Sequence, residues 1–254
     1  MFNMKPLIKQ GSAIYEYDGS FIGFLSCAYQ CFMDETLPMG IYGQEEGQRT
    51  LWIPEQVISD TKKSDLLENA IIRQSSHRAF EIASHAFLSC LENKEMQILS
   101  FLSDCSEYGS HVEHRIIRPA VHFVWRAEKQ LLREAHLYTG FIRFLEHEHK
   151  LIAIIDPKNQ VLPIIASHFI QRYGNETFLV YDTTHKSALI HHRGQTSIDE
   201  LTSLNLPSLS DKEALYQALW KCFYDTIGIV DRSNPKCRRT HMPKRYWNRL
   251  PEMQ

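Results

Sequence analysis

The sequence predicts an α+β fold, with a mainly helical N-terminal half, a small antiparallel β-β-α-β-β unit and a helical, basic C-terminal tail. Before residue 140 apolar residues recur every three or four positions, which is typical of helices with one buried face. After Gly140 the spacing falls to two, which is typical of strands. We expect a single domain over residues 1–254, made of a helical part at 13–139, a β-β-α-β-β part at 140–193 and the tail at 210–254.

The N-terminal segment begins with a predicted strand and turn at 13–20. Asp18 or Ser20 can cap the helix that is predicted over 21–32. The next segment, 34–60, contains three glycines and two prolines and has no sustained period. This composition favours a loop, with a short strand at 50–53.

Helical spacing returns after the loop. The segments 64–91 and 95–101 fit two or three helices, and a break is predicted at 104–109. Pro119 stands at a favourable first position for a helix that runs to about Tyr138.

The β-β-α-β-β unit follows from the change of period. It consists of strands at 141–147 and 150–155, a turn at 156–159, a helix at 161–173, and strands at 177–182 and 188–192. Further helices near 210–226 and 243–249 complete the chain.

Composition indicates an ordinary globular protein, with 43% apolar and 23% charged residues. The sequence has no apolar run long enough to cross a bilayer and no secretory signal, so we expect a cytoplasmic protein without membrane contact. Its six cysteines form no Cys-x-x-Cys pair and are expected to be free thiols. The phosphate-loop, dinucleotide-loop and radical SAM cysteine patterns are also missing, so we expect no cofactor.

Charge is divided unevenly along the chain. Residues 232–254 carry seven basic and one acidic side chain, which gives +6, and the remaining 21 basic and 29 acidic side chains give −8 to residues 1–231. A cationic tail on an acidic body is typical of proteins that contact polyanions.

The tail combines these cations with aromatic rings. Cations neutralise phosphates, and exposed rings offer faces on which unpaired bases stack. The predicted nucleic-acid-binding residues of the tail are Arg238, Arg239, Lys244, Arg245, Tyr246 and Trp247. In the alternative interpretation, Tyr246 and Trp247 fold back as core anchors, and the cations only form an exposed edge of the protein in contact with solvent.

A second basic feature lies in the helix before the sheet. Arg126, Lys129, Arg133 and His136 share one helical face, and Arg143 can extend this stripe toward the sheet. We predict that Arg126, Lys129, Arg133 and Arg143 bind nucleic acid. The alternative is a solvated helix face.

Four residues have side chains that can act as general acids or bases or hold a divalent metal: Glu134, His136, Asp156 and His168. They are the candidates for catalysis. The pairs His147/His149 and Cys237/His241 have ligand-like spacing, but each lacks a third ligand, so we predict no metal site.

Short motifs along nearly the whole chain resemble one bacterial family. They are Tyr17-Asp18-Gly19-Ser20-Phe21, Arg133-Glu134-Ala135-His136, Gly140-Phe141-Ile142-Arg143-Phe144, Ile155-Asp156-Pro157 and Met242-Pro243-Lys244-Arg245-Tyr246-Trp247 with Leu250-Pro251-Glu252. The chain resembles the family called "probable DNA metabolism protein". Its members are encoded beside a putative DNA modification or repair radical SAM protein, and relatives are fused to a uracil-DNA glycosylase-like domain.

This resemblance implies a role in DNA repair or modification. The first hypothesis is a DNA-binding accessory protein that presents single-stranded or damaged duplex DNA to the radical SAM partner. The second is a DNA-processing enzyme, a nuclease or a base-processing hydrolase, built from the four acid-base candidates. The third is a protein-protein adaptor whose tail docks on an acidic partner surface.

Overall fold

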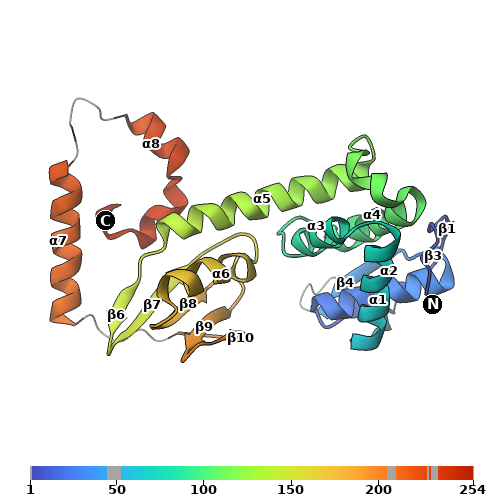
Figure 1. Cartoon of the computed structure of the whole chain (residues 1–254), viewed down its shortest axis with the longest axis horizontal. Coiled ribbons are helices and arrows are strands. Elements are labelled where there is room, and N and C mark those ends of the chain that lie inside the picture. Colours follow the sequence, from blue (N-terminus) through green and yellow to red (C-terminus); the bar gives the residue numbers. More distant parts are fainter. Residues whose placement is uncertain (1, 45–52, 205–209, 228, 230–233, 254) are drawn as a thin grey trace. The chain divides into compact units, whose positions relative to one another are not determined.

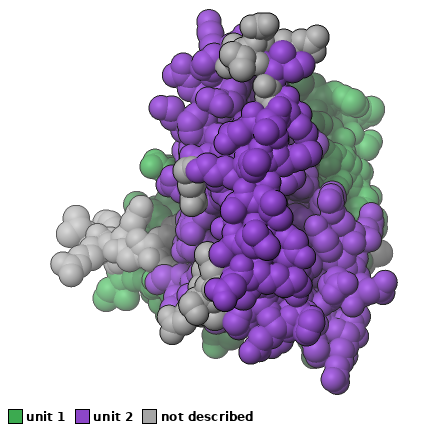
Figure 2. All heavy atoms as spheres, turned by 90° about the vertical axis from the view of Figure 1, so that its left-hand side faces the viewer, with its two compact units in different colours: residues 1–131 green, residues 132–254 purple. Residues whose placement is uncertain are grey.

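The computed structural model describes residues 2–44, 53–204, 210–227, 229 and 234–253. The chain forms two compact units, Met1–Leu131 and Leu132–Gln254, which Figure 2 distinguishes by colour. Helices dominate the first half and the larger sheet lies in the second, which confirms the α+β class (Figure 1). No helix within the described residues has both the length and the apolar character needed to cross a membrane.

Unit 1 begins with short strands around one helix. These are β1 (Lys9–Gln10), β2 (Ile14–Tyr17), α1 (Phe21–Asp34), β3 (Thr36–Leu37), β4 (Gly40–Gly43) and β5 (Glu55–Gln56). The predicted cap of α1 is confirmed, because the Ser20 hydroxyl accepts the Gly23 N–H at 3.0 Å. A parallel three-stranded sheet with the order β4-β2-β5 was not predicted. The strand predicted at 50–53 falls mainly on residues 50–52, outside the described residues.

Four helices complete unit 1: α2 (Thr61–Gln74), α3 (His77–Phe87), α4 (Lys94–Tyr108) and the first part of α5 (Pro119–Phe141). Helix α4 continues through most of the predicted break and ends at Tyr108. The next residue, Gly109, has a φ of 56°, which favours glycine. A 3₁₀ helix, Gly109–His114, leads on toward α5. Pro119 begins α5 as predicted.

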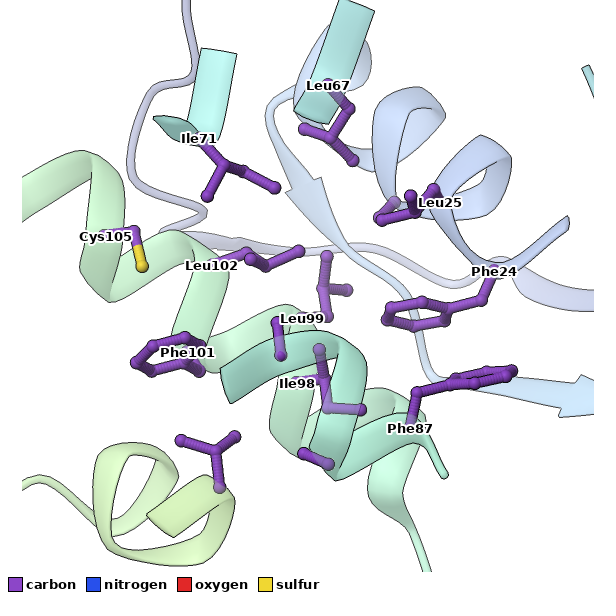
Figure 3. Packing of buried hydrophobic residues seen from close by; sticks show 14 of the residues in the cluster. Phe24, Leu25, Leu67, Ile71, Phe87, Ile98, Leu99, Phe101, Leu102 and Cys105 are labelled. Atoms are coloured by element: carbon purple, nitrogen blue, oxygen red, sulfur yellow. The ribbon is translucent and has the colours of Figure 1, made fainter. Parts of the chain in front are cut away.

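The core of unit 1 lies between α1, α2, α3 and α4. Figure 3 shows Phe24 and Leu25 of α1 facing side chains of the other three helices. Cys27 and Cys31 are fully buried on α1, and burial raises the pKa of the Cys27 thiol to about 12. These cysteines therefore act as small apolar core residues.

Unit 2 is built on a five-stranded sheet with the order β10-β9-β8-β7-β6. Its elements are β6 (Leu145–His147), β7 (Lys150–Ile155), α6 (Leu162–Tyr173), β8 (Thr177–Asp182), β9 (Ser187–His192) and β10 (Gln195–Glu200). The predicted strand-strand-helix-strand-strand succession is confirmed. The first strand starts later than predicted, because α5 continues to Phe141.

One pairing differs from the antiparallel prediction. Strands β7 and β8 are parallel, while the other three pairs are antiparallel. The reason is the crossover, because α6 carries the chain from the carboxyl end of β7 back to the end at which β7 begins, so that β8 runs in the same direction (Figure 1). Strand β10 was not predicted, because its six residues are all exposed and only Ile198 is strongly apolar.

The chain ends with α7 (Asp211–Ile227), α8 (Pro235–His241) and two 3₁₀ helices, η4 (Lys244–Arg249) and η5 (Pro251–Met253). Helix α7 and η4 were predicted, and α8 was not. The side chain of Asn234 caps α8 by accepting the Cys237 N–H at 3.0 Å, and Pro235 occupies the first turn.

Candidate nucleic-acid interface

The C-terminal segment packs on the end of α5. Tyr246 is 3% exposed, and its ring lies 5.0 Å from that of Tyr138 and 5.1 Å from that of Phe141. Leu250 is fully buried. Tyr246 is therefore a core anchor, which agrees with the alternative interpretation of this residue, and its ring offers no free face to a base.

Three arginines of unit 2 form ion pairs. Arg245 contacts Glu134 at 3.0 Å, Arg249 contacts Asp156 at 2.6 Å, and Arg143 contacts Glu252 at 2.6 Å. The side chains of Glu134 and Glu252 are each 3% exposed. A buried carboxylate needs a cation and hydrogen-bond donors, so these arginines hold the segment in place.

Glu134 also fixes the turn after β7. Its carboxylate accepts the Lys158 N–H at 3.1 Å and the Asn159 N–H at 2.9 Å, and it accepts the side-chain amide of Asn159 as well. Together with the contact from Arg245, these bonds give each oxygen of the Glu134 carboxylate at least one donor. This candidate for catalysis is thus fully occupied in the structure.

Asp156 lies at the carboxyl end of β7, beside the same turn. It accepts both the Nε and the Nη2 of Arg249 and the hydroxyl of Thr183. The hydrogen bond from Arg249 lowers the pKa of Asp156 below its ordinary value. Glu134 and Asp156 are therefore brought to the same end of β7, each bound to an arginine of η4.

The two histidine candidates are placed elsewhere on unit 2. His136 is exposed on α5, one turn before Thr139, whose hydroxyl donates to the His136 carbonyl. His168 is exposed on α6 and packs edge-on against Phe169 at 5.0 Å. Within the described residues, no group of three or more His, Cys, Asp or Glu side chains is arranged to hold a metal ion.

The other tail cations are exposed and carry no ion pair in the described part of the chain. They are Lys236, Arg238 and Arg239 of α8 and Lys244 of η4. Two of them lie over the ring of Trp247, with Arg238 Cζ at 5.4 Å and Lys244 Nζ at 5.9 Å from its centre. Trp247 is half-buried and donates its Nε1–H to the Met242 carbonyl at 3.0 Å. We call these five residues the Trp247 cluster.

The α5 stripe is exposed at Arg126, Lys129 and Arg133. Arg126 lies 5.6 Å from the centre of the Phe123 ring. Arg126 and Lys129 belong to unit 1, and Arg133 belongs to unit 2.

Two residues of the stripe are linked to the tail in the described part of the chain: Arg143 pairs with Glu252, and the charge of Arg133 acts on Tyr246. Burial raises the pKa of Tyr246, and the positive charges of Arg245 and Arg133 act in the opposite direction. Arg133 is thus near enough to η4 for its charge to reach the Tyr246 hydroxyl.

Sequence reasoning missed the anchoring roles of Arg249 and Glu252. Their partners, Asp156 and Arg143, lie 93 and 109 residues away in the chain. Apart from opposite charge, no local pattern marks such pairs. It also missed Asp182, a buried residue that accepts the His185 N–H and pairs with its ring at 2.6 Å, which tightens the turn between β8 and β9.

The ion pairs predict acid sensitivity of unit 2. Burial would raise the pKa of Glu252, but hydrogen bonds from Arg143 and Trp220 contribute to a net lowering. A lowered folded-state pKa gives stability that is complete above the unfolded value, about 4.3, and is lost as the pH falls through the folded value.

The Glu252→Gln variant should therefore lose less stability than the wild type between about pH 6 and pH 3. Urea denaturation at each pH measures this. The exposed Glu176→Gln should keep the wild-type pH profile. An unchanged profile in Glu252→Gln would show that this pair does not contribute to the acid sensitivity.

Comparison with known families places part of the chain in a family. The model of a domain family of unknown function, DUF4130, matches residues 92–252. This range contains every nucleic-acid-binding and catalytic candidate predicted from the sequence. Neither the curated proteins nor the solved structures that were searched gave a match. Because the family model covers more than half of the chain, this protein belongs to the DUF4130 family.

Proposed function

We propose that this protein binds DNA as an accessory factor in repair or modification, and that it presents the strand to a radical SAM partner enzyme. The observation that supports a DNA contact is that the tail cations fall into two groups, those that pair with carboxylates and those that do not. Arg245 and Arg249 pair with carboxylates, whereas the four cations of the Trp247 cluster are exposed and carry no ion pair within the described residues. Only cations without such partners can neutralise phosphates at no cost to the fold.

Trp247 supports an unpaired strand as the ligand. Its indole is half-buried and held by the bond to Met242, so the ring is fixed in orientation. Arg238 and Lys244 lie over it, which places two phosphate-binding groups beside a ring on which a base can stack. Arg133 adds a further cation within electrostatic reach of η4.

The partner in this proposal comes from the resemblance to the "probable DNA metabolism protein" family. Arg143 and Arg245 were also predicted to bind DNA. In the structure, both hold buried carboxylates. We therefore assign the primary contacts to Arg133 and the Trp247 cluster.

The salt dependence of DNA binding tests this proposal. If the four cations of the Trp247 cluster each contact a phosphate, log K falls against log salt with a slope of about −2.8 on a single strand and about −3.6 on a duplex. These slopes correspond to a loss of affinity of roughly 50-fold and roughly 150-fold between about 50 and 200 mM salt. Changing all four to alanine should remove most of this slope. Fluorescence anisotropy with a labelled 20-nucleotide single strand and with the matching duplex measures it.

A matched control removes the same charge from other exposed positions. The substitutions are Lys9→Ala, Lys62→Ala, Lys158→Ala and Arg172→Ala. This variant should keep the wild-type slope. An equal loss in both variants, or an unchanged slope in the cluster variant, would contradict the assignment of DNA contact to the Trp247 cluster.

A further inference from the structure

Helix α7 exposes a continuous apolar face. Six large side chains on it are between 41% and 59% exposed, and at about 100° per residue they span an arc of roughly 140°. Single exposed apolar residues are common, but a contiguous patch of this kind marks an interaction surface. The α7 apolar face consists of Leu215, Tyr216, Leu219, Trp220, Phe223 and Ile227.

The polar side of α7 faces the rest of unit 2. Glu213 is 8% exposed and accepts the Glu146 N–H at 3.2 Å, and Gln217 donates to Glu213 at 3.1 Å. Trp220, at the border of the apolar face, donates its Nε1–H to Glu252 at 3.0 Å. A surface helix normally turns its apolar side inward. In α7 it is a polar side that contacts the unit, and within the described residues the six apolar side chains stay about half-exposed.

A groove runs beside this face. Tyr216, Leu219, Trp220 and Phe223 line it on one side, and its volume is about 570 Å³. The sheet edge and the C-terminal segment supply the other lining, which includes Phe144, Leu145, Leu151 and Pro251. The ridge formed by the α7 apolar face is therefore also one wall of the groove, an arrangement that a two-fold axis can make self-complementary.

We propose that α7 of one copy packs antiparallel against α7 of a second copy, with the ridge of each helix in the groove of the other. The area is sufficient. An aromatic side chain buries about 150–250 Å², so six half-exposed side chains offer on the order of 500–600 Å² per copy, and the dimer reaches about 1,000–1,200 Å², the lower limit of specific interfaces. The apolar side chains on the sheet side of the groove, Phe144, Leu145 and Leu151, add to this area.

The charges also fit two identical faces. Lys212 is the only charged residue of α7 that falls within the apolar arc, so two copies meet without an array of like charges. In an antiparallel pair centred on Leu219, Lys212 lies opposite position 226 of the second copy, at the carboxyl end of that helix. A cation is favoured there by the helix dipole. A parallel pair would instead place the two Lys212 side chains together.

Sedimentation and light scattering of the full chain test the dimer. At about 100 µM the wild type should be a dimer of the 29.7 kDa chain, and the double variant Leu219→Asp/Phe223→Asp should be a monomer with an unchanged helical content. The matched control is Leu66→Asp, since Leu66 is an exposed leucine on α2, outside this face. It should remain a dimer. A monomeric wild type, which would leave the face to a different protein, overturns the proposal, as does a dimer that survives the double variant.

Cross-linking tests the antiparallel arrangement. The background carries Cys90→Ser, Cys222→Ser and Cys237→Ser, which removes the exposed thiols. Leu219→Cys in this background should form a disulfide-linked dimer under mild oxidation, and Leu66→Cys should not. A dimer by mass in which Leu219→Cys fails to cross-link overturns the register centred on Leu219. Neither experiment depends on DNA binding.

Discussion

Tyr246→Ala should lower the free energy of unfolding of unit 2 by about 3–5 kcal/mol, the usual cost of removing a buried aromatic ring. The ring contacts Tyr138 and Phe141 of α5 and is 3% exposed. Its loss leaves a cavity that the α5 helix cannot easily close. Hydrogen exchange measured over β7 and the end of α5 reports the change within unit 2.

Tyr246→Phe is the matched control, because it keeps the ring and removes only the hydroxyl that accepts from Arg245 at 2.6 Å. Its cost should be about 0.5–1.5 kcal/mol, the range for one hydrogen bond. A similar small cost for Tyr246→Ala would mean that Tyr246 does not anchor the C-terminal segment.

Glu134→Ala should also destabilise unit 2 by about 3–5 kcal/mol, because it breaks a buried ion pair and leaves its donors without an acceptor. Arg245, two backbone N–H groups and the Asn159 amide all point to this carboxylate. The turn at 158–159 should lose hydrogen-exchange protection first, because the Glu134 carboxylate accepts both of its backbone N–H groups.

The exposed Glu200→Ala provides the comparison, and it should change the stability by less than about 0.5 kcal/mol. Glu134 was a candidate for catalysis, so the same variant separates two roles. Normal stability of Glu134→Ala together with a lost DNA-processing activity would favour the catalytic role over the anchoring role.

Local periodicity was sufficient for much of the fold. Helices α1, α5 and α6 and strands β7, β8 and β9 were predicted with ends that differ by no more than a few residues. Each buries one face, so its own sequence carries the period of its secondary structure. Strand β10 and helix α8 were missed for the same reason, because both are exposed and their side chains show no apolar period.

The candidate site was predicted less completely. Sequence alone found that the tail is cationic and aromatic, but it could not separate Arg238 and Lys244, which are exposed around Trp247, from Arg245, which holds Glu134. Nor could it distinguish the buried ring of Tyr246 from the half-buried ring of Trp247, one residue away.

By itself, then, the sequence determined the α+β class, most of the elements and the cationic character of the tail, because composition and apolar period are local properties. Only the tertiary structure decided which cations are available to a ligand and which hold the fold, and which side of α7 is left uncovered. The arginines depend on partners that lie 93 and 109 residues away in the chain, and α7 is held by groups that lie 67 and 32 residues away. Such partners are set by how the chain packs.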